Sequence, residues 1–131
     1  MIYADTNVII RLLEGQPAVR APIENRLQPF RGLTQFLLTS RLGRLECRCK
    51  PLREGNAALL GLYESFFGSA EVLLLEIDAM VVEKATELRA SLNLKTPDAI
   101  HLASAILAKV TLFLTADQAL QRCTQVPIEI V

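Results

Sequence analysis

Short apolar runs, separated by longer segments with helical spacing, form the main pattern of this chain. The runs lie at Met1–Ala4, Leu33–Thr39, Glu71–Ile77, Thr111–Thr115 and Ile128–Val131. Most of them do not alternate with polar residues, which is typical of strands that are covered on both faces in a parallel sheet. The last run does alternate, and this pattern predicts a peripheral strand.

The segments between these runs predict helices. Their apolar positions recur every three or four residues, namely Val19, Ile23 and Leu27 behind Pro17; Ala58, Leu59, Leu62 and Phe66 within residues 54–67; and Val81, Ala85, Leu88 and Leu92 behind the N-cap candidate Asp78. Residues 97–109 are apolar nearly all round, which predicts a helix buried in the domain. Strands that alternate with helices indicate right-handed βαβ units. We therefore expect one domain over residues 1–131, with an α/β fold in which a central parallel sheet of four to five strands is flanked by helices.

Composition narrows the class of protein. Hydrophobic residues make up 51% of the 131 residues, yet no uncharged apolar run approaches the roughly 18 residues of a membrane span. There is no basic leader before Asp5, so we expect a cytoplasmic protein without a signal peptide or a membrane anchor. The 14 basic and 14 acidic residues give a net charge of +0, which neither predicts nor excludes a nucleic-acid partner.

The supply of soft metal ligands is small. The three cysteines form no C-x-x-C pair, and we interpret them as packed, reduced thiols. The single histidine, His101, excludes a histidine-based metal site. Any metal bound by side chains of this chain would therefore be held mainly by oxygen.

One acid falls in an unexpected place. If residues 41–49 form a helix, Leu42, Leu45 and Cys49 share one stripe, which we predict faces the core. Glu46 lies within that stripe, where a carboxylate needs a partner. Its position more than one turn inside the helix rules out a capping role.

Three further acids lie at junctions between the predicted elements. Asp5 follows the first strand, Asp98 opens the buried helix, and Asp117 follows the fourth strand. The carboxyl ends of parallel strands line the crevice where ligands bind, so these acids are expected to share one edge with Glu46. Each aspartate also has a local explanation: Asp5 as a turn residue, Asp98 behind a cap at Thr96, and Asp117 within a capping box.

A cluster of Asp5, Glu46, Asp98 and Asp117 would be repulsive unless a cation were present. Oxygen ligands alone favour Mg²⁺ or Mn²⁺, and such ions commonly complete their shells with water and substrate phosphate. The predicted chemistry is hydrolysis of a phosphodiester by a metal-activated water, with the four acids as metal ligands. We expect Thr6, Asn7 and Thr115 to support these ligands by hydrogen bonds.

With these residues in place, the chain resembles PIN-domain ribonucleases, and more narrowly the VapC-type toxins of toxin–antitoxin pairs. The stretches that carry the resemblance occur in the family's order: "YADTNVII", "TSRLGRLECRCKPL", "LKTPDAIHLASA" and "LFLTADQAL". The resemblance implies a PIN-like fold, a Mg²⁺- or Mn²⁺-dependent endoribonuclease acting on RNA, a homodimer, and a small antitoxin as inhibitor. It implies that acids at the positions of Asp5, Glu46, Asp98 and Asp117 form the site.

Two other functions compete with the nuclease. A haloacid-dehalogenase-like phosphatase would use Asp5 as nucleophile, but Asn7 stands where its second aspartate belongs. A PIN fold that has lost catalysis would act only by dimerising or binding a partner. Arg44 and Arg48 are predicted either to be solvated or to contact RNA phosphates or an antitoxin. His101 is interpreted as a packed or hydrogen-bonded core residue rather than a general base.

Overall fold

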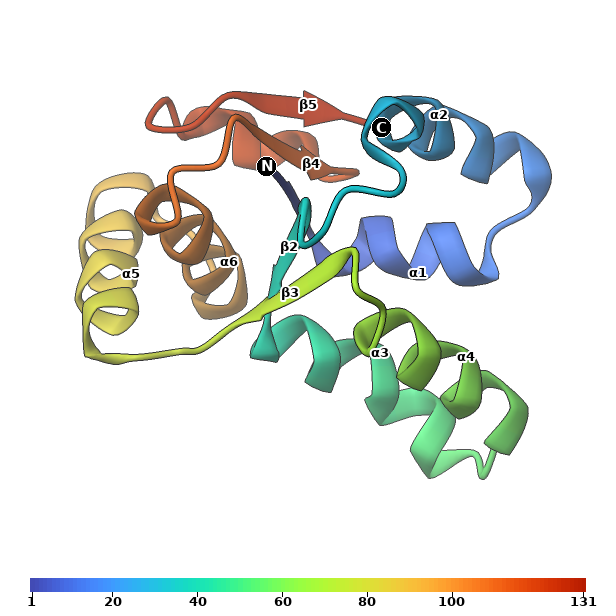
Figure 1. Cartoon of the computed structure of the whole chain (residues 1–131). Coiled ribbons are helices and arrows are strands. Elements are labelled where there is room, and N and C mark those ends of the chain that lie inside the picture. Colours follow the sequence, from blue (N-terminus) through green and yellow to red (C-terminus); the bar gives the residue numbers. More distant parts are fainter.

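A five-stranded parallel sheet forms the centre of the computed structural model, which describes residues 1–131 (Figure 1). The strands are β1 (Ile2–Ala4), β2 (Leu37–Ser40), β3 (Val72–Leu75), β4 (Leu112–Thr115) and β5 (Ile128–Ile130). Their order is β3-β2-β1-β4-β5, and every neighbouring pair is parallel. The α/β fold with a parallel sheet is thus confirmed, and the alternating run at the C-terminus is an edge strand as predicted.

Six α-helices flank this sheet. They are α1 (Thr6–Glu14), α2 (Pro17–Leu27), α3 (Arg41–Arg53), α4 (Ala57–Phe67), α5 (Ala79–Leu92) and α6 (Thr96–Leu107), with short 3₁₀ helices at Gln28–Phe30 (η1) and Gln118–Arg122 (η2). In Figure 1, α5 and α6 lie to one side of the sheet and α1 to α4 lie to the other. None of these helices combines the length and the apolar character that crossing a bilayer requires.

Two hydrophobic cores explain why the strand sequences do not alternate. Tyr3, Leu38 and Phe113 pack in the core beneath α5 and α6, while their chain neighbours Leu37 and Leu114 pack in the core beneath α1 to α4. Successive side chains of a strand point to opposite faces, so a strand covered on both faces is apolar at every position. This double burial holds the carboxyl ends of β1 and β4 in fixed positions.

Several local predictions were wrong. The second strand begins at Leu37 rather than Leu33, because Gln35 adopts a left-handed backbone (φ 51°) that a strand does not tolerate. The helix α1 was not predicted, although Asp5 caps its first turn. Lys95, rather than Thr96, is the N-cap of α6.

The inward face of α3 was also predicted wrongly. Its buried residues are Gly43, Cys47 and Pro51, whereas Leu45 is 62% exposed and Cys49 is exposed. Leu45 and Leu52 therefore point outward, Leu42 is partly buried, and small side chains face the sheet. Glu46 neighbours the buried face and is only partly exposed, so it still lies on the side of the helix that faces the other acids.

Candidate active site

Four acids come from the ends of four different elements. Asp5 directly follows β1, Asp117 lies just beyond β4, and Asp98 stands in the first turn of α6. Glu46 lies in the second turn of α3, which leaves β2 at Ser40. Because β1, β2 and β4 are adjacent and parallel, all of these elements meet at one edge of the sheet.

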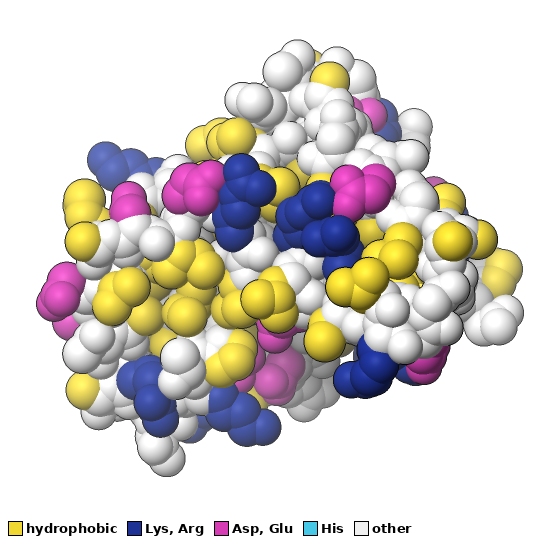
Figure 2. Space-filling model, turned by 90° about the horizontal axis from the view of Figure 1, so that it is seen from below, with side chains coloured by type: hydrophobic (Ala, Val, Ile, Leu, Met, Phe, Trp, Pro, Cys, Tyr) yellow, Lys and Arg dark blue, Asp and Glu magenta, His cyan; other side chains and the backbone are white.

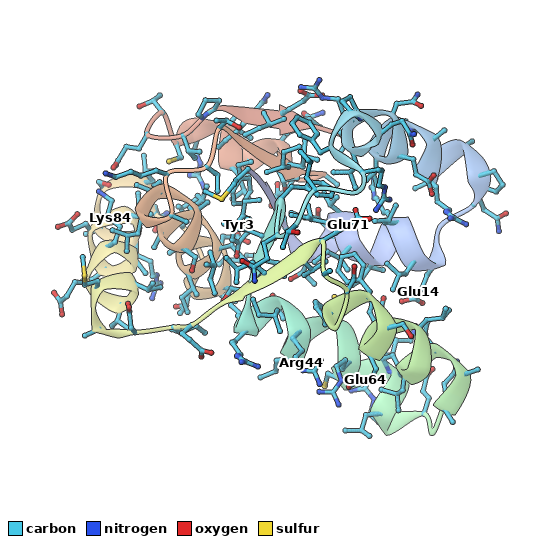
Figure 3. All side chains as sticks on the ribbon, in the orientation of Figure 1. Tyr3, Glu14, Arg44, Glu64, Glu71 and Lys84 are labelled. Carbon is cyan, nitrogen blue, oxygen red and sulfur yellow. The ribbon has the colours of Figure 1, made fainter.

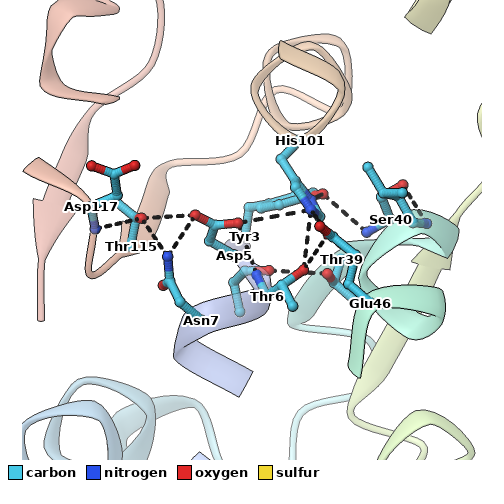
Figure 4. Close-up of polar contacts among 12 residues, drawn as sticks. Tyr3, Asp5, Thr6, Asn7, Thr39, Ser40, Glu46, His101, Thr115 and Asp117 are labelled. Carbon is cyan, nitrogen blue, oxygen red and sulfur yellow. Dashed lines mark hydrogen bonds and ion pairs between the residues drawn. The ribbon is translucent and has the colours of Figure 1, made fainter. Parts of the chain in front are cut away.

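Asp5 is the most firmly held of the acids. It is only 4% exposed, and its Oδ1 accepts a hydrogen bond from the Thr6 backbone N–H at 2.8 Å. Its Oδ2 accepts from the Thr115 hydroxyl at 2.8 Å and from the Asn7 amide at 3.1 Å (Figure 4). The supporting contacts predicted for Thr6 and Asn7 are therefore present around Asp5, whereas Thr115, expected to support Asp117, donates its hydroxyl to Asp5 instead. These bonds fix the carboxylate without adding a positive charge.

Asp117 is connected to Asp5 through Thr115. The Asp117 backbone N–H donates to the Thr115 hydroxyl at 3.1 Å, and the same hydroxyl donates to Asp5. The Asp117 carboxylate also caps η2 by accepting from the Ala119 N–H at 2.9 Å. The capping explanation for Asp117 is thus correct in part, and it does not remove the residue from the acidic edge.

The pKa of Asp98 reflects the negative charge that gathers at this edge of the sheet. Burial, followed by the negative charges of Asp5 and Asp117, raises the pKa of Asp98 above its usual value. The nearby His101 and Lys95 lower it by less. The three aspartates therefore repel one another, and the positive charge nearby does not offset this repulsion.

Glu46 has a different environment. Its Oε1 accepts a hydrogen bond from the Thr6 hydroxyl at 2.8 Å and lies 2.7 Å from Nε2 of His101. Burial raises the pKa of Glu46, but the hydrogen bonds from His101 and Thr6 outweigh burial and bring the pKa below its usual value. Glu46 thus faces the site, and its partner is the one histidine of the chain.

Gly43 allows α3 to come this close. A Cβ at this position would lie 2.7 Å from Oγ1 of Thr39 and 3.6 Å from both Cε1 of His101 and Oγ1 of Thr6. The contact with Thr39 is a clash, so a side chain would force the helix away from β2, whereas the contacts with α6 and α1 are ordinary van der Waals distances. The approach of Glu46 to His101 depends on the absence of that side chain.

Two arginines of α3, Arg44 and Arg48, form ion pairs with α4 rather than with the four acids of the site. Arg44 approaches Oε1 of Glu64 on α4 at 2.7 Å (Figure 3). Arg48 approaches the same oxygen at 3.2 Å, and the Arg44 guanidinium also lies over the ring of Phe67. They therefore join α3 to α4. Their predicted contact with RNA or an antitoxin is not tested by this geometry and stays a prediction.

The donor set suits a hard divalent cation. Mg²⁺ and Mn²⁺ prefer carboxylate oxygens, and mutual repulsion among Asp5, Asp98 and Asp117 is what such an ion would relieve. No three of the histidine, cysteine, aspartate and glutamate side chains stand close enough together to hold an ion as they are. Side chains would have to move to bind an ion. Both oxygens of Asp5 accept hydrogen bonds, whereas Asp117 and Glu46 each have one oxygen without a partner in the chain. The carboxylate of Asp98 makes no hydrogen bond and is the most available of the four.

Sequence reasoning missed three residues that build this site: Tyr3, Gly43 and Ser40. The Tyr3 hydroxyl bonds Nδ1 of His101 at 2.7 Å and accepts from the Ser40 backbone N–H at 3.0 Å. The only sequence signal for this group was a histidine three residues after Asp98. The prediction that His101 is a hydrogen-bonded core residue agrees with its 1% exposure.

Comparison with known proteins identifies the fold family. The sequence model of the PIN domain matches residues 2–125, while a search of curated proteins finds no significant match. Similar solved structures include a toxin–antitoxin complex from Klebsiella pneumoniae (20% identity, TM-score 0.73, covering 96% of this chain and 95% of that one). Another is VapBC2 from Rickettsia felis bound to a DNA fragment from its promoter (18%, 0.76, 99% and 98%). A third is FitAcB from Neisseria gonorrhoeae (18%, 0.73, 98% and 96%). Because the family model matches nearly the whole sequence, this chain belongs to the PIN domain family.

Proposed function

We propose that this chain is a Mg²⁺- or Mn²⁺-dependent endoribonuclease that acts as the toxin of a toxin–antitoxin pair. The observation that carries the proposal is the gathering of Asp5, Asp98 and Asp117 at one edge, where burial and then the charges of the other two aspartates raise the pKa of Asp98. An edge with an excess of negative charge suits a divalent ion with a phosphodiester, because the phosphate oxygens complete the shell of the ion. The solved toxin–antitoxin complexes of similar fold support the biological role.

The residues of the chain have separate tasks in this proposal. Asp5, held by three hydrogen bonds, would be the fixed ligand, while Asp98 and Asp117 would close around the ion from α6 and from the end of β4. Glu46 would accept a hydrogen bond from the attacking water through its free oxygen Oε2. The ion, when bound, supplies a lowered water pKa and stabilises the leaving oxygen.

A toxin of this class would be cytoplasmic, and we propose two protein partners for it. One is an antitoxin, as in the complexes of similar fold. The other is a second copy of the chain, bound through the outward face of α3, where Leu45, Cys49 and Leu52 are exposed at helical spacing. Figure 2 shows hydrophobic side chains gathered on the lower face of the molecule, with basic side chains between them. Light scattering of the wild type and of Leu45→Glu tests the dimer, which the variant should dissociate.

Cleavage of RNA tests the enzymatic proposal. Purified protein should cut total RNA with Mn²⁺ or Mg²⁺, and excess EDTA should stop the reaction. Asp5→Asn should lower the rate by more than about 100-fold, since it removes a proposed metal ligand while the fold survives. The matched control is Glu83→Gln, an exposed acid on α5 that makes no ion pair, and it should cut like the wild type.

The outcomes separate the three candidate functions. A folded protein that cuts no RNA in the presence of Mn²⁺ would favour the binding module. Release of phosphate from p-nitrophenyl phosphate would favour the phosphatase. The structure gives that alternative no support, because both ends of the Asn7 amide are engaged, with Asp5 at 3.1 Å and with the Ala116 N–H at 2.9 Å.

A further inference from the structure

His101 is a buried polar residue that the proposed reaction does not itself use. It lies on α6, one turn after Asp98, and is 1% exposed. Both ring nitrogens are engaged, Nδ1 with the Tyr3 hydroxyl at 2.7 Å and Nε2 with Oε1 of Glu46 at 2.7 Å (Figure 4). The histidine therefore connects the first strand to the catalytic edge through side chains alone.

The hydrogen-bond pattern determines the tautomer of the ring. The Ser40 backbone N–H can only donate, and it donates to the Tyr3 hydroxyl oxygen at 3.0 Å. The ring nitrogen on the other side fixes where the hydrogens lie, because the Glu46 carboxylate can only accept and Nε2 at 2.7 Å from Oε1 must therefore donate to it. In the neutral ring Nδ1 then carries no hydrogen, so it accepts the hydroxyl hydrogen of Tyr3 at 2.7 Å.

This donation affects only one oxygen of Glu46. Oε1 receives the His101 N–H and the Thr6 hydroxyl at 2.7 and 2.8 Å, whereas Oε2 makes no hydrogen bond within the chain. A glutamate that is 30% exposed would otherwise sample several rotamers. Two donors on the same oxygen restrict it to one orientation and leave the other oxygen available.

We propose that His101 is a positioning residue, held by Tyr3, that fixes Glu46 through Oε1 and keeps Oε2 free to bind water in the site. The inference rests on the proposed nuclease function, and it assigns Glu46 a contact to water rather than a place among the principal metal ligands. Thr6 contributes to both halves of the site, because its hydroxyl bonds Glu46 and its backbone N–H bonds Asp5. The network thus joins the glutamate to the aspartates.

The tautomer gives a test that needs neither metal nor RNA. The chain contains one histidine, so a long-range ¹H–¹⁵N spectrum of the labelled, metal-free protein at pH 8 shows one imidazole. We expect Nδ1 to be unprotonated and Nε2 to carry the hydrogen. A ring protonated on Nδ1, or one that averages between the two tautomers, would overturn the proposal.

Two substitutions separate positioning from packing. His101→Gln retains an N–H donor near the position of Nε2, while His101→Leu fills the space without a donor. In Mn²⁺-dependent cleavage we expect His101→Leu to lower kcat by about 10- to 100-fold with KM for RNA little changed, and His101→Gln to stay within about fivefold of the wild type. Ser104→Ala is the control, because it removes a different buried polar group of α6, a hydroxyl that has no hydrogen-bond partner.

Each outcome has a defined meaning. Equal loss in His101→Gln and His101→Leu, or wild-type kcat in a folded His101→Leu, would overturn the positioning role while RNA cleavage itself stands. A wild-type protein that cuts no RNA would instead refute the proposed function, and the spectrum would still test the orientation of the ring. If His101→Leu does not fold, the spectrum of the wild type and the rate of His101→Gln decide the question.

Discussion

Gly43→Ala should destabilise the protein, although alanine is the better helix former. The new Cβ would lie 2.7 Å from Oγ1 of Thr39, well inside ordinary contact distance, and that hydroxyl is itself held by a 3.0 Å bond to the Ala4 carbonyl. Overpacking of this kind costs about 1–3 kcal/mol. The gain in helix propensity offsets about 1 kcal/mol of that cost. We expect a net loss of up to about 2 kcal/mol in the free energy of unfolding.

A second glycine inside a helix, Gly61, serves as a control for the gain in helix propensity that any Gly→Ala change brings. Gly61 lies inside α4, and a Cβ there would meet nothing within 4 Å, so Gly61→Ala should stabilise the protein by about 1 kcal/mol. The difference between the two variants is the cost of the clash alone, about 1–3 kcal/mol, or about 3–9 °C in Tm for a chain of this size. Urea unfolding at equal protein concentration measures both.

The same pair of residues gives a direct check on the cause. Thr39→Ala removes the atom that a Cβ at position 43 would meet, so Gly43→Ala should cost less, or become stabilising, in the Thr39→Ala background. Cleavage of RNA should fall in the single variant, because displacement of α3 moves Glu46 from His101. If Gly43→Ala and Gly61→Ala change stability equally, the close approach of α3 is not what this glycine permits.

Three further predictions concern charge, thiols and a buried hydroxyl. In EDTA at pH 7, Asp98→Asn should raise Tm. The folded pKa of Asp98 is raised, so the wild type loses stability as pH rises from the unfolded pKa of about 4 through the folded pKa. The advantage of the variant should therefore vanish below about pH 4, and a lower Tm of the variant at pH 7 would contradict the repulsion. One thiol of three, the exposed Cys49, should react with Ellman's reagent in the folded, monomeric Leu45→Glu variant, and all three in denaturant; rapid reaction of a second thiol would show that the buried cysteines are not packed. Tyr63→Phe should cost about 1.5–3 kcal/mol in urea unfolding because the phenol donates to the Glu14 carboxylate, and an unchanged midpoint would show that this bond contributes nothing.

The sequence predicted the parts of the fold in which large apolar residues carry the pattern. The stripe of Val81, Ala85 and Leu88 on α5 and its cap at Asp78 are confirmed, because that helix packs a broad apolar face on the sheet. In α3 the same reasoning was wrong. This helix packs so closely that its inward face is built from small residues such as Gly43, and Leu45 and Leu52 point to solvent.

Part of the candidate site could likewise be predicted from the sequence, and part of it could not. The acids were predictable because a strand end fixes where Asp5 and Asp117 lie before any side chain is placed. The network around His101 was not predictable, since its bond to Tyr3 joins residues 98 positions apart across the sheet. Contacts of that kind depend on how closely a helix packs against the sheet, and the spacing of apolar residues along the sequence does not give that distance.

Binding of Mn²⁺ to the metal-free protein tests the central claim most directly. Calorimetric titration of the EDTA-stripped wild type, without RNA, should show at least one ion bound per chain, with affinity lost in Asp5→Asn and in Asp98→Asn and retained in Glu83→Gln. A folded wild type that binds no Mn²⁺, or an Asp5→Asn variant that binds it equally well, would contradict the assignment of these carboxylates as the metal site.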